Sequence, residues 1–221
     1  MNLDFSAVKK TAQVLNESVP AILKVLRAKK DDVLFVLGQT ENINDLKAFH
    51  HYFSDYLEVK KLALKKIDNL LSEKILRANT IKEISEVFKL CSCSDNSRSN
   101  ALMKWINLCS TFSDMREVYG AARYDAETEK VIPTVILKWL CLCNKLSDFG
   151  IIEHLLSNQK GTDLWREFSD KWDNFAMKEI AKSYKLDDFI EIYKLSREDS
   201  PAKEEALIQI YRISITYQAV C

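Results

Sequence analysis

Apolar residues recur along this chain at the spacing of one face of an α-helix. In the segment YLEVKKLALKKIDNLLSEKILRA (residues 56–78), Val59, Leu62, Ile67 and Leu71 follow steps close to three and four residues, with lysines between them. This spacing is typical of amphipathic helices, whereas strict alternation of apolar and polar residues, which indicates strands, does not occur. Further apolar-rich helical segments are 101–109, 135–143 and 175–184. The pattern therefore predicts an all-α fold.

A two-helix unit recurs along the chain. The segment NKLSDFGIIEHLL (residues 144–156) reads as a helix end, a polar cap and the start of a second helix. Steps of 34 or 35 residues toward the N-terminus, and one step of 40 toward the C-terminus, reach similar positions. The apolar anchors of the five second helices are Leu46, Ile81, Met115, Phe149 and Phe189. Because periods of this length are typical of stacked helical hairpins, we expect an antiparallel helix-hairpin array (an α-solenoid) with a period of about 34 residues.

Each anchor follows a residue that is suited to begin a helix. These residues are Asp45, Thr80, Asp114, Asp148 and Asp188. Because a short side-chain oxygen can accept hydrogen bonds from the unpaired amides of a first helical turn, we expect all five to be N-caps. Acids follow three residues after three of them, at Glu83, Glu117 and Glu191. This predicts a capping box at Thr80 and acidic relatives of it at Asp114 and Asp188.

The repeat also predicts the domain organisation. Residues 1–30 should form an N-terminal helical cap, and residues 31–221 a single helical-repeat domain of about five hairpins plus a terminal helix. The last segment, EEALIQIYRISITYQAVC (residues 204–221), looks like the first helix of another unit without its partner helix. We expect it to be a capping helix or part of a longer array.

The segment TVILKWLCLCNKLSDFGIIEHLLSNQKG (residues 134–161) combines Leu-Cys late in its first helix with an Asp-capped second helix. This unit resembles the tetratricopeptide/pentatricopeptide superfamily of helical-hairpin repeats, and the likeness covers about residues 30 to 220. The resemblance implies a groove that binds a peptide or protein. In the RNA-reading pentatricopeptide class, a polar residue near the start of the first helix contacts a base, and Asn100, Thr134 and Asn174 fall on that register.

The amino-acid composition limits the classes of partner that we expect. Lys plus Arg and Asp plus Glu both total 32, so no net charge directs the protein to nucleic acid or to anionic lipid. No segment approaches the roughly 18 uncharged apolar residues that a membrane span needs, and we expect no membrane partner. The N-terminal segment MNLDFSAVKKTAQVL contains an acid and no uninterrupted apolar run, unlike a secretory signal. We therefore expect a cytoplasmic, reducing location, although non-classical export fits the same features.

Few features of the sequence indicate catalysis, cofactor binding or metal binding. The cysteine pairs Cys91/Cys93 and Cys141/Cys143 have one residue between their thiols, whereas zinc sites usually use C-x₂₋₄-C. The histidines are His50, His51 and His154, and no nucleotide-binding or catalytic motif accompanies them. We expect no catalytic, cofactor-binding or metal residues, and hence no enzyme and no cofactor.

One set of basic residues recurs in register with the hairpins. Lys104, Lys138 and Lys178 each come one position before Trp105, Trp139 and Glu179 respectively. The lysines could line one binding face, or they could form a solvated stripe. The tryptophans at repeated positions are interpreted as core between repeats.

The sequence therefore predicts a non-enzymatic protein- or peptide-binding helical-repeat module that acts as a scaffold, adaptor or regulator, with Lys104, Lys138 and Lys178 as candidate binding residues. Two alternatives stay open. One is a pentatricopeptide-like RNA-binding protein, which the neutral charge disfavours. The other is a secreted helical effector of a bacterial pathogen or symbiont that has no signal sequence.

Overall fold

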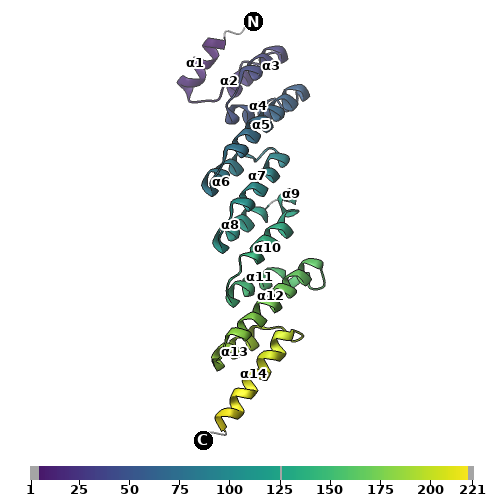
Figure 1. The fold of residues 1–221 in the computed structure, drawn as a ribbon. Coiled ribbons are helices and arrows are strands. Elements are labelled where there is room, and N and C mark those ends of the chain that lie inside the picture. The colour runs from purple at the N-terminus through teal and green to yellow at the C-terminus, as the bar shows by residue number, and fades with distance from the viewer. Residues whose placement is uncertain (1–4, 125, 219–221) are drawn as a thin grey trace. The chain divides into compact units, whose positions relative to one another are not determined.

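The fold is all-α, as the apolar periodicity predicts. A computed structural model describes residues 5–124 and 126–218, and the side chains of 6–124 and 128–215. Across these residues every regular element is a helix and no strand occurs (Figure 1). None of the described helices combines the length and the apolar composition needed to cross a membrane.

The helices group into two compact units. Unit 1 comprises residues 1–109 and 124–129, and unit 2 comprises residues 110–123 and 130–221. Unit 1 contains α1 (Phe5–Leu15), α2 (Val19–Val25), α3 (Lys30–Gln39), α4 (Ile43–Tyr52), α5 (Leu57–Arg77), α6 (Ile81–Leu90), α7 (Asp95–Leu108) and α9 (Ala126–Glu129). Unit 2 contains α8 (Phe112–Ala122), α10 (Ile132–Cys141), α11 (Leu146–Leu156), the 3₁₀ turn η1 (Ser157–Gln159), α12 (Asp163–Lys182), α13 (Leu186–Leu195) and α14 (Pro201–Gln218). The expected division into residues 1–30 and 31–221 stays a prediction.

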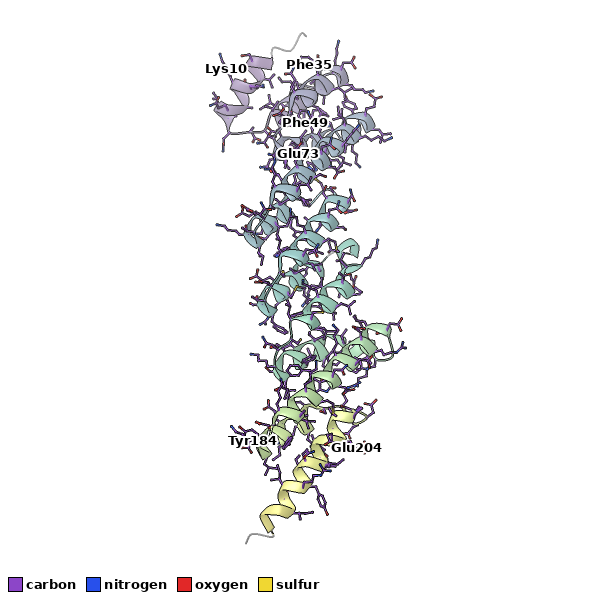
Figure 2. The ribbon with its side chains drawn as sticks, in the orientation of Figure 1. Lys10, Phe35, Phe49, Glu73, Tyr184 and Glu204 are labelled. Atoms are coloured by element: carbon purple, nitrogen blue, oxygen red, sulfur yellow. The ribbon has the colours of Figure 1, made fainter. Side chains whose placement is uncertain are left out.

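Both units pack their helices in the same order. In unit 1, α4 packs against α5 and α6 against α7, while α5 also contacts α3 and α7. In unit 2, α8 packs against α10 and α13 against α14, while α12 also contacts α10 and α14. Fully buried side chains such as Phe49 (labelled in Figure 2) and Phe168 occupy the two cores. Each unit therefore buries its apolar helical faces against sequential neighbours.

Aromatic residues connect a second helix with the first helix that follows it. The ring of Trp105 lies 5.8 Å from that of Phe88, and the ring of Trp139 lies 5.8 Å from that of Tyr119. Phe149 meets Trp172 at 5.4 Å in the same way. Trp105 and Trp139 are buried, which confirms the interpretation of these tryptophans as core. Burial of such large apolar surfaces is a major contribution to the packing of each unit.

The five predicted second helices correspond to α4, α6, α8, α11 and α13. Leu46, Met115, Phe149 and Phe189 are each the fourth residue of their helix, and all four are buried. Ile81 is instead the first residue of α6, and Ile84 takes the buried fourth position. The five helices begin 38, 31, 34 and 40 residues apart, so a constant period of 34 residues is not confirmed.

The expected N-cap is correct at Thr80 and wrong at the four aspartates. Thr80 forms a full capping box with Glu83. Asp114, by contrast, is the third helical residue: Thr111 is the N-cap, and the Asp114 carboxylate accepts a hydrogen bond from the Thr111 amide at 2.9 Å. Asp45 is likewise the third residue of α4, behind the N-cap Asn42.

Asp148 and Asp188 are also third residues, behind the N-cap positions Lys145 and Lys185, whose side chains make no capping hydrogen bond. The acidic boxes expected from Asp114 to Glu117 and from Asp188 to Glu191 are therefore wrong as well. The physical reason is that an aspartate can satisfy amides at a helix start from the third position as well as from the N-cap, so its presence alone does not fix which position it occupies. The sequence pattern places these starts three residues too late.

Candidate functional site

A cleft of about 370 Å³ opens in unit 2 where α12 ends and α13 begins. Leu146 of α11, Phe175 of α12 and Ile192 of α13 provide its apolar lining, and Ile192 is almost fully buried. The first residues of α11 close a third side. Four charged residues complete the lining, namely Lys145, Glu179, Asp188 and Glu191.

Polar contacts fix part of this lining. The Lys182 ammonium lies 2.9 Å from the Glu179 carboxylate. The hydroxyl of Ser183, the C-cap of α12, donates to the Asp188 carboxylate at 2.5 Å and so connects the end of α12 with the start of α13. Glu191 is exposed, and no hydrogen bond or ion pair to another described residue engages its carboxylate. The cleft therefore presents an accessible anionic group beside an apolar floor.

Unit 1 has a cleft of about 330 Å³ where α5 ends and α6 begins. Its apolar residues are Ala78, the C-cap of α5, and Val87 and Leu90 of α6. The charged lining consists of Lys74, Arg77, Glu83 and Glu86. The Glu83 carboxylate accepts hydrogen bonds from the amides of Asn79 at 2.8 Å and Thr80 at 3.1 Å. These bonds, together with the Thr80 side chain, lower the pKa of Glu83 because they favour its charged form.

The two clefts occupy the same positions of their helices. Five positions are shared: the C-cap of the first helix, the residue four before it, and the third, sixth and seventh residues of the second helix. In the order unit 1 and unit 2, the pairs are Ala78 and Ser183, Lys74 and Glu179, Glu83 and Asp188, Glu86 and Glu191, and Val87 and Ile192. Three pairs keep their chemical character. The pair four residues before the C-cap reverses its charge.

The two clefts differ in the net charge of the residues that line them. Two cations and two anions line the cleft of unit 1, whereas one cation and three anions line that of unit 2. Most of these side chains reach solvent, so water and salt screen their interactions with a ligand, and the sign of the charges sets a preference rather than a large affinity. The clefts can therefore accept extended side chains of different charge.

Lysines connect α5 and α12, the helices that line the two clefts, with neighbouring helices. The Lys66 ammonium of α5 donates to the carbonyls of Leu37 at 3.2 Å and Gly38 at 2.5 Å, at the C-terminus of α3. The Lys104 ammonium of α7 donates to the carbonyl of Leu76 at 2.7 Å, near the C-terminus of α5. In unit 2, Lys171 of α12 lies 3.1 Å from the thiol of Cys141, the last residue of α10. Cations stabilise helix C-termini because the last carbonyls are unpaired and carry partial negative charge.

The helices α5 and α12 each have an aspartate near the middle that accepts hydrogen bonds from residues at or just before the start of a later helix, α7 or α14 respectively. Asp68 of α5 accepts hydrogen bonds from the hydroxyls of Ser94 and Ser97, the latter at 2.6 Å. In unit 2, Asp173 of α12 accepts from the Ser200 hydroxyl at 2.5 Å and from the Arg197 guanidinium at 3.0 Å. These two contacts are called the Asp68 node and the Asp173 node below.

The three predicted binding lysines differ in their burial and in their contacts. Lys104 is half-buried in unit 1 and engaged at the end of α5. Lys138 is half-buried and Lys178 is exposed, and both belong to unit 2. Lys178 directly precedes the cleft residue Glu179. A binding role for the three lysines stays a prediction.

The polar residues that match the pentatricopeptide register do not share one place in their helices. Asn100 and Thr134 lie near the starts of α7 and α10, but Asn174 lies in the middle of α12. Asn174 therefore does not lie near the start of a first helix, as the pentatricopeptide register requires, because α12 extends much farther toward the N-terminus than α10 does.

Burial disfavours the reactive thiolate form of three cysteines in the predicted pairs, Cys91, Cys93 and Cys143. Burial raises the pKa of Cys91 to about 11 and that of Cys143 to about 12, and it also raises the pKa of Cys93. All cysteines of the described chain are free, and Cys221 lies outside the described residues. Within those residues, no cluster of three or more His, Cys, Asp or Glu is placed to hold a metal ion.

Sequence reasoning missed the cleft residues. A usable signal was present: EISEV (residues 83–87) and DFIEI (residues 188–192) share the order acid, apolar, any residue, acid, apolar. Aligning Ile81 with Phe189 hid this match, which appears once Ile84 is aligned with Phe189.

Comparisons with known proteins give no relatives. No protein family, no curated protein and no solved structure matches the chain significantly. The likeness to the tetratricopeptide/pentatricopeptide superfamily is therefore not confirmed.

Proposed function

We propose that this chain is a non-enzymatic helical-repeat protein, similar to tetratricopeptide proteins, that binds a peptide or protein segment through the two clefts. In this proposal the helices form a hairpin solenoid, and the protein acts as a scaffold, adaptor or regulator in a reducing compartment. The observation that carries the proposal is the recurrence of the cleft at the same helical positions in both units.

Recurrence matters because helical repeats build binding surfaces from equivalent positions of successive units. The acid at the third position also serves the helix start and the apolar seventh position also serves the core, so the acid at the sixth position is the part of the match that neither capping nor core packing requires. Here Glu83, Glu86 and Val87 in unit 1 match Asp188, Glu191 and Ile192 in unit 2.

The clefts suit peptide side chains in size and chemistry. Their volumes, about 370 and 330 Å³, lie at the lower end of the range for ligand pockets, which begins near 300 Å³. The apolar floor can bury the aliphatic part of a side chain, and the charged lining can pair with its polar end. Each cleft by itself would bind one such side chain of a peptide together with its immediate neighbours.

The experiment selects peptides from a displayed library on the full chain and measures their affinity by fluorescence anisotropy. The decisive variant is Ser147→Trp, because Ser147 is the exposed second residue of α11 and lines the unit 2 cleft. The matched control is Ser157→Trp, which places the same bulk at the exposed opposite end of α11. We expect peptides of the unit 2 cleft to bind Ser147→Trp at least about tenfold more weakly, a loss of about 1.4 kcal/mol.

If both variants and the original chain bind the peptides with equal affinity, the unit 2 cleft is not a peptide-binding site. The lysine prediction is tested on the same peptides with Lys138→Glu and Lys178→Glu. Lys104 is better changed to Gln, since Lys104→Gln keeps a donor for the Leu76 carbonyl. RNA binding is the competing outcome: salt-dependent binding of homopolymer RNA without any selected peptide would replace the peptide proposal.

A further inference from the structure

The outer face of α14 carries an apolar seam that no other described helix covers. α14 packs against α12 and α13, and its buried residues Ala202 and Ala206 face them. On the opposite face, Leu207, Ile208, Tyr211 and Ile215 are between 37% and 65% exposed. Four large apolar side chains on a single helical face are more than the scattered exposure that is normal for a protein surface.

The spacing of this seam is that of a helix that packs against another helix. Leu207, Tyr211 and Ile215 are spaced four residues apart and form one row along α14. The neighbouring row consists of Glu204, Ile208 and Arg212, also four residues apart. Figure 2 labels Glu204 near the start of α14. The second row thus has an acid at one end, an apolar residue in the middle and a base at the other end.

This charge order is self-complementary when two copies of α14 pair in opposite directions. Ile208 is the midpoint between Glu204 and Arg212, so a twofold axis at Ile208 brings Glu204 of each copy beside Arg212 of the other. The same axis sets Leu207 of one copy near Tyr211 of the other. Parallel pairing would instead put like charges side by side, which is unfavourable.

We propose that two copies of this chain associate through an antiparallel contact between their α14 helices, with Ile208 at the twofold axis. The occupant of the seam is thus a second copy of the chain. Because four apolar side chains per copy make a contact well below the roughly 1,200 Å² of stable complexes, the dimer is weak, with a Kd on the order of 100 µM. This inference does not depend on the peptide-binding clefts.

Sedimentation velocity of the full chain at concentrations from well below to several times the expected Kd, on the order of 10 to 500 µM, tests the proposal. We expect a monomer–dimer equilibrium for the original chain and a monomer for Ile208→Asp, with circular dichroism confirming that this exposed change leaves the fold intact. Monomer at every concentration for the original chain would overturn the proposal.

Charge exchange tests the antiparallel geometry. Glu204→Arg alone and Arg212→Glu alone should each weaken self-association about tenfold, because each puts like charges together in both halves of the contact. The two single variants mixed together, and the double variant carrying both changes, should associate as the original chain does. The double variant is a matched control, since it has the same composition as the original chain. Unchanged self-association of both single variants would overturn the antiparallel contact.

Discussion

The clefts of unit 1 and unit 2 stand at the same positions of their helices but differ in charge. The third and sixth residues of α6 and α13 are acids in both clefts, and the seventh is apolar in both. The residue four positions before the C-cap is Lys74 in unit 1 and Glu179 in unit 2. One repeated helix geometry therefore fixes where the cleft lies, while a single exposed position changes the charge that a ligand would meet.

An aspartate node holds a cleft-lining helix in each unit. The Asp68 carboxylate accepts hydrogen bonds from the hydroxyls of Ser94 and Ser97, and the Asp173 carboxylate accepts from the Ser200 hydroxyl and the Arg197 guanidinium. Both members of the Asp173–Arg197 pair are at most 21% exposed, so this ion pair is shielded from water. An ion pair of this kind is expensive to break, because removing one partner leaves a charge without compensation.

Changes at the two aspartate nodes should therefore have the largest effect on the free energy of unfolding. Asp173→Ala should destabilise unit 2 by about 3 kcal/mol, because it leaves the Arg197 guanidinium without its carboxylate. Asp68→Ala should destabilise unit 1 by at least about 1.5 kcal/mol, since the hydroxyls of Ser94 and Ser97 lose their acceptor. Hydrogen exchange read by mass spectrometry measures each unit separately. No destabilisation of unit 2 by Asp173→Ala would contradict the stabilising role of the shielded ion pair.

Exchanging the charges that distinguish the clefts should exchange their preferences. In the double variant Lys74→Glu, Glu179→Lys, a peptide that favours the acidic cleft of unit 2 should bind that cleft about tenfold more weakly, or about 1.4 kcal/mol. The same peptide should bind the unit 1 cleft more tightly. Titrations monitored by hydrogen exchange resolve the two clefts. Unchanged preferences would mean that these two side chains do not contact the ligand.

The starts of α6 and α13 offer a smaller contrast. Thr80 completes a capping box on α6, so Thr80→Ala should cost about 1 kcal/mol. Lys185 makes no side-chain cap on α13, so Lys185→Ser should stabilise that start by up to about 1 kcal/mol. Thermal unfolding monitored by circular dichroism measures both. Stabilisation by Thr80→Ala, or destabilisation by Lys185→Ser, would contradict the capping geometry.

The smallest expected effect is the pH response of the unit 1 cleft. Because hydrogen bonds lower the pKa of Glu83, its contribution to stability is complete above the unfolded pKa of about 4.3 and is lost as the pH falls through the lower folded value. An NMR titration of the Glu83 carboxyl carbon should give a midpoint below about 4.3. Thr80→Ala should raise the midpoint, and a midpoint at or above the ordinary value in the original chain would contradict the capping box.

Apolar periodicity was enough to predict the all-α class and the second helices. Leu46, Met115, Phe149 and Phe189 were recognisable because a buried fourth residue follows a polar helix start. The same rule failed at Ile81, where Thr80 is the true N-cap and the buried residue comes at Ile84. Helix starts are ambiguous in sequence because the N-cap and the third residue favour similar side chains.

The clefts could not be predicted in the same way. Each depends on how the end of one helix meets the start of the next, and these distances are not encoded in the periodicity of either helix. Lys104 shows the same limit: its position suggested a binding face, but its ammonium reaches the Leu76 carbonyl, 28 residues earlier in the chain.

Hydrogen exchange of the full chain with a selected peptide tests the central claim most directly, because it locates the ligand without a substitution. We expect the peptide to slow exchange at the end of α12 and the start of α13, or at the end of α5 and the start of α6, where the cleft residues lie. Protection confined to other helices, or no protection at a saturating peptide concentration, would contradict the assignment of the clefts as the binding sites.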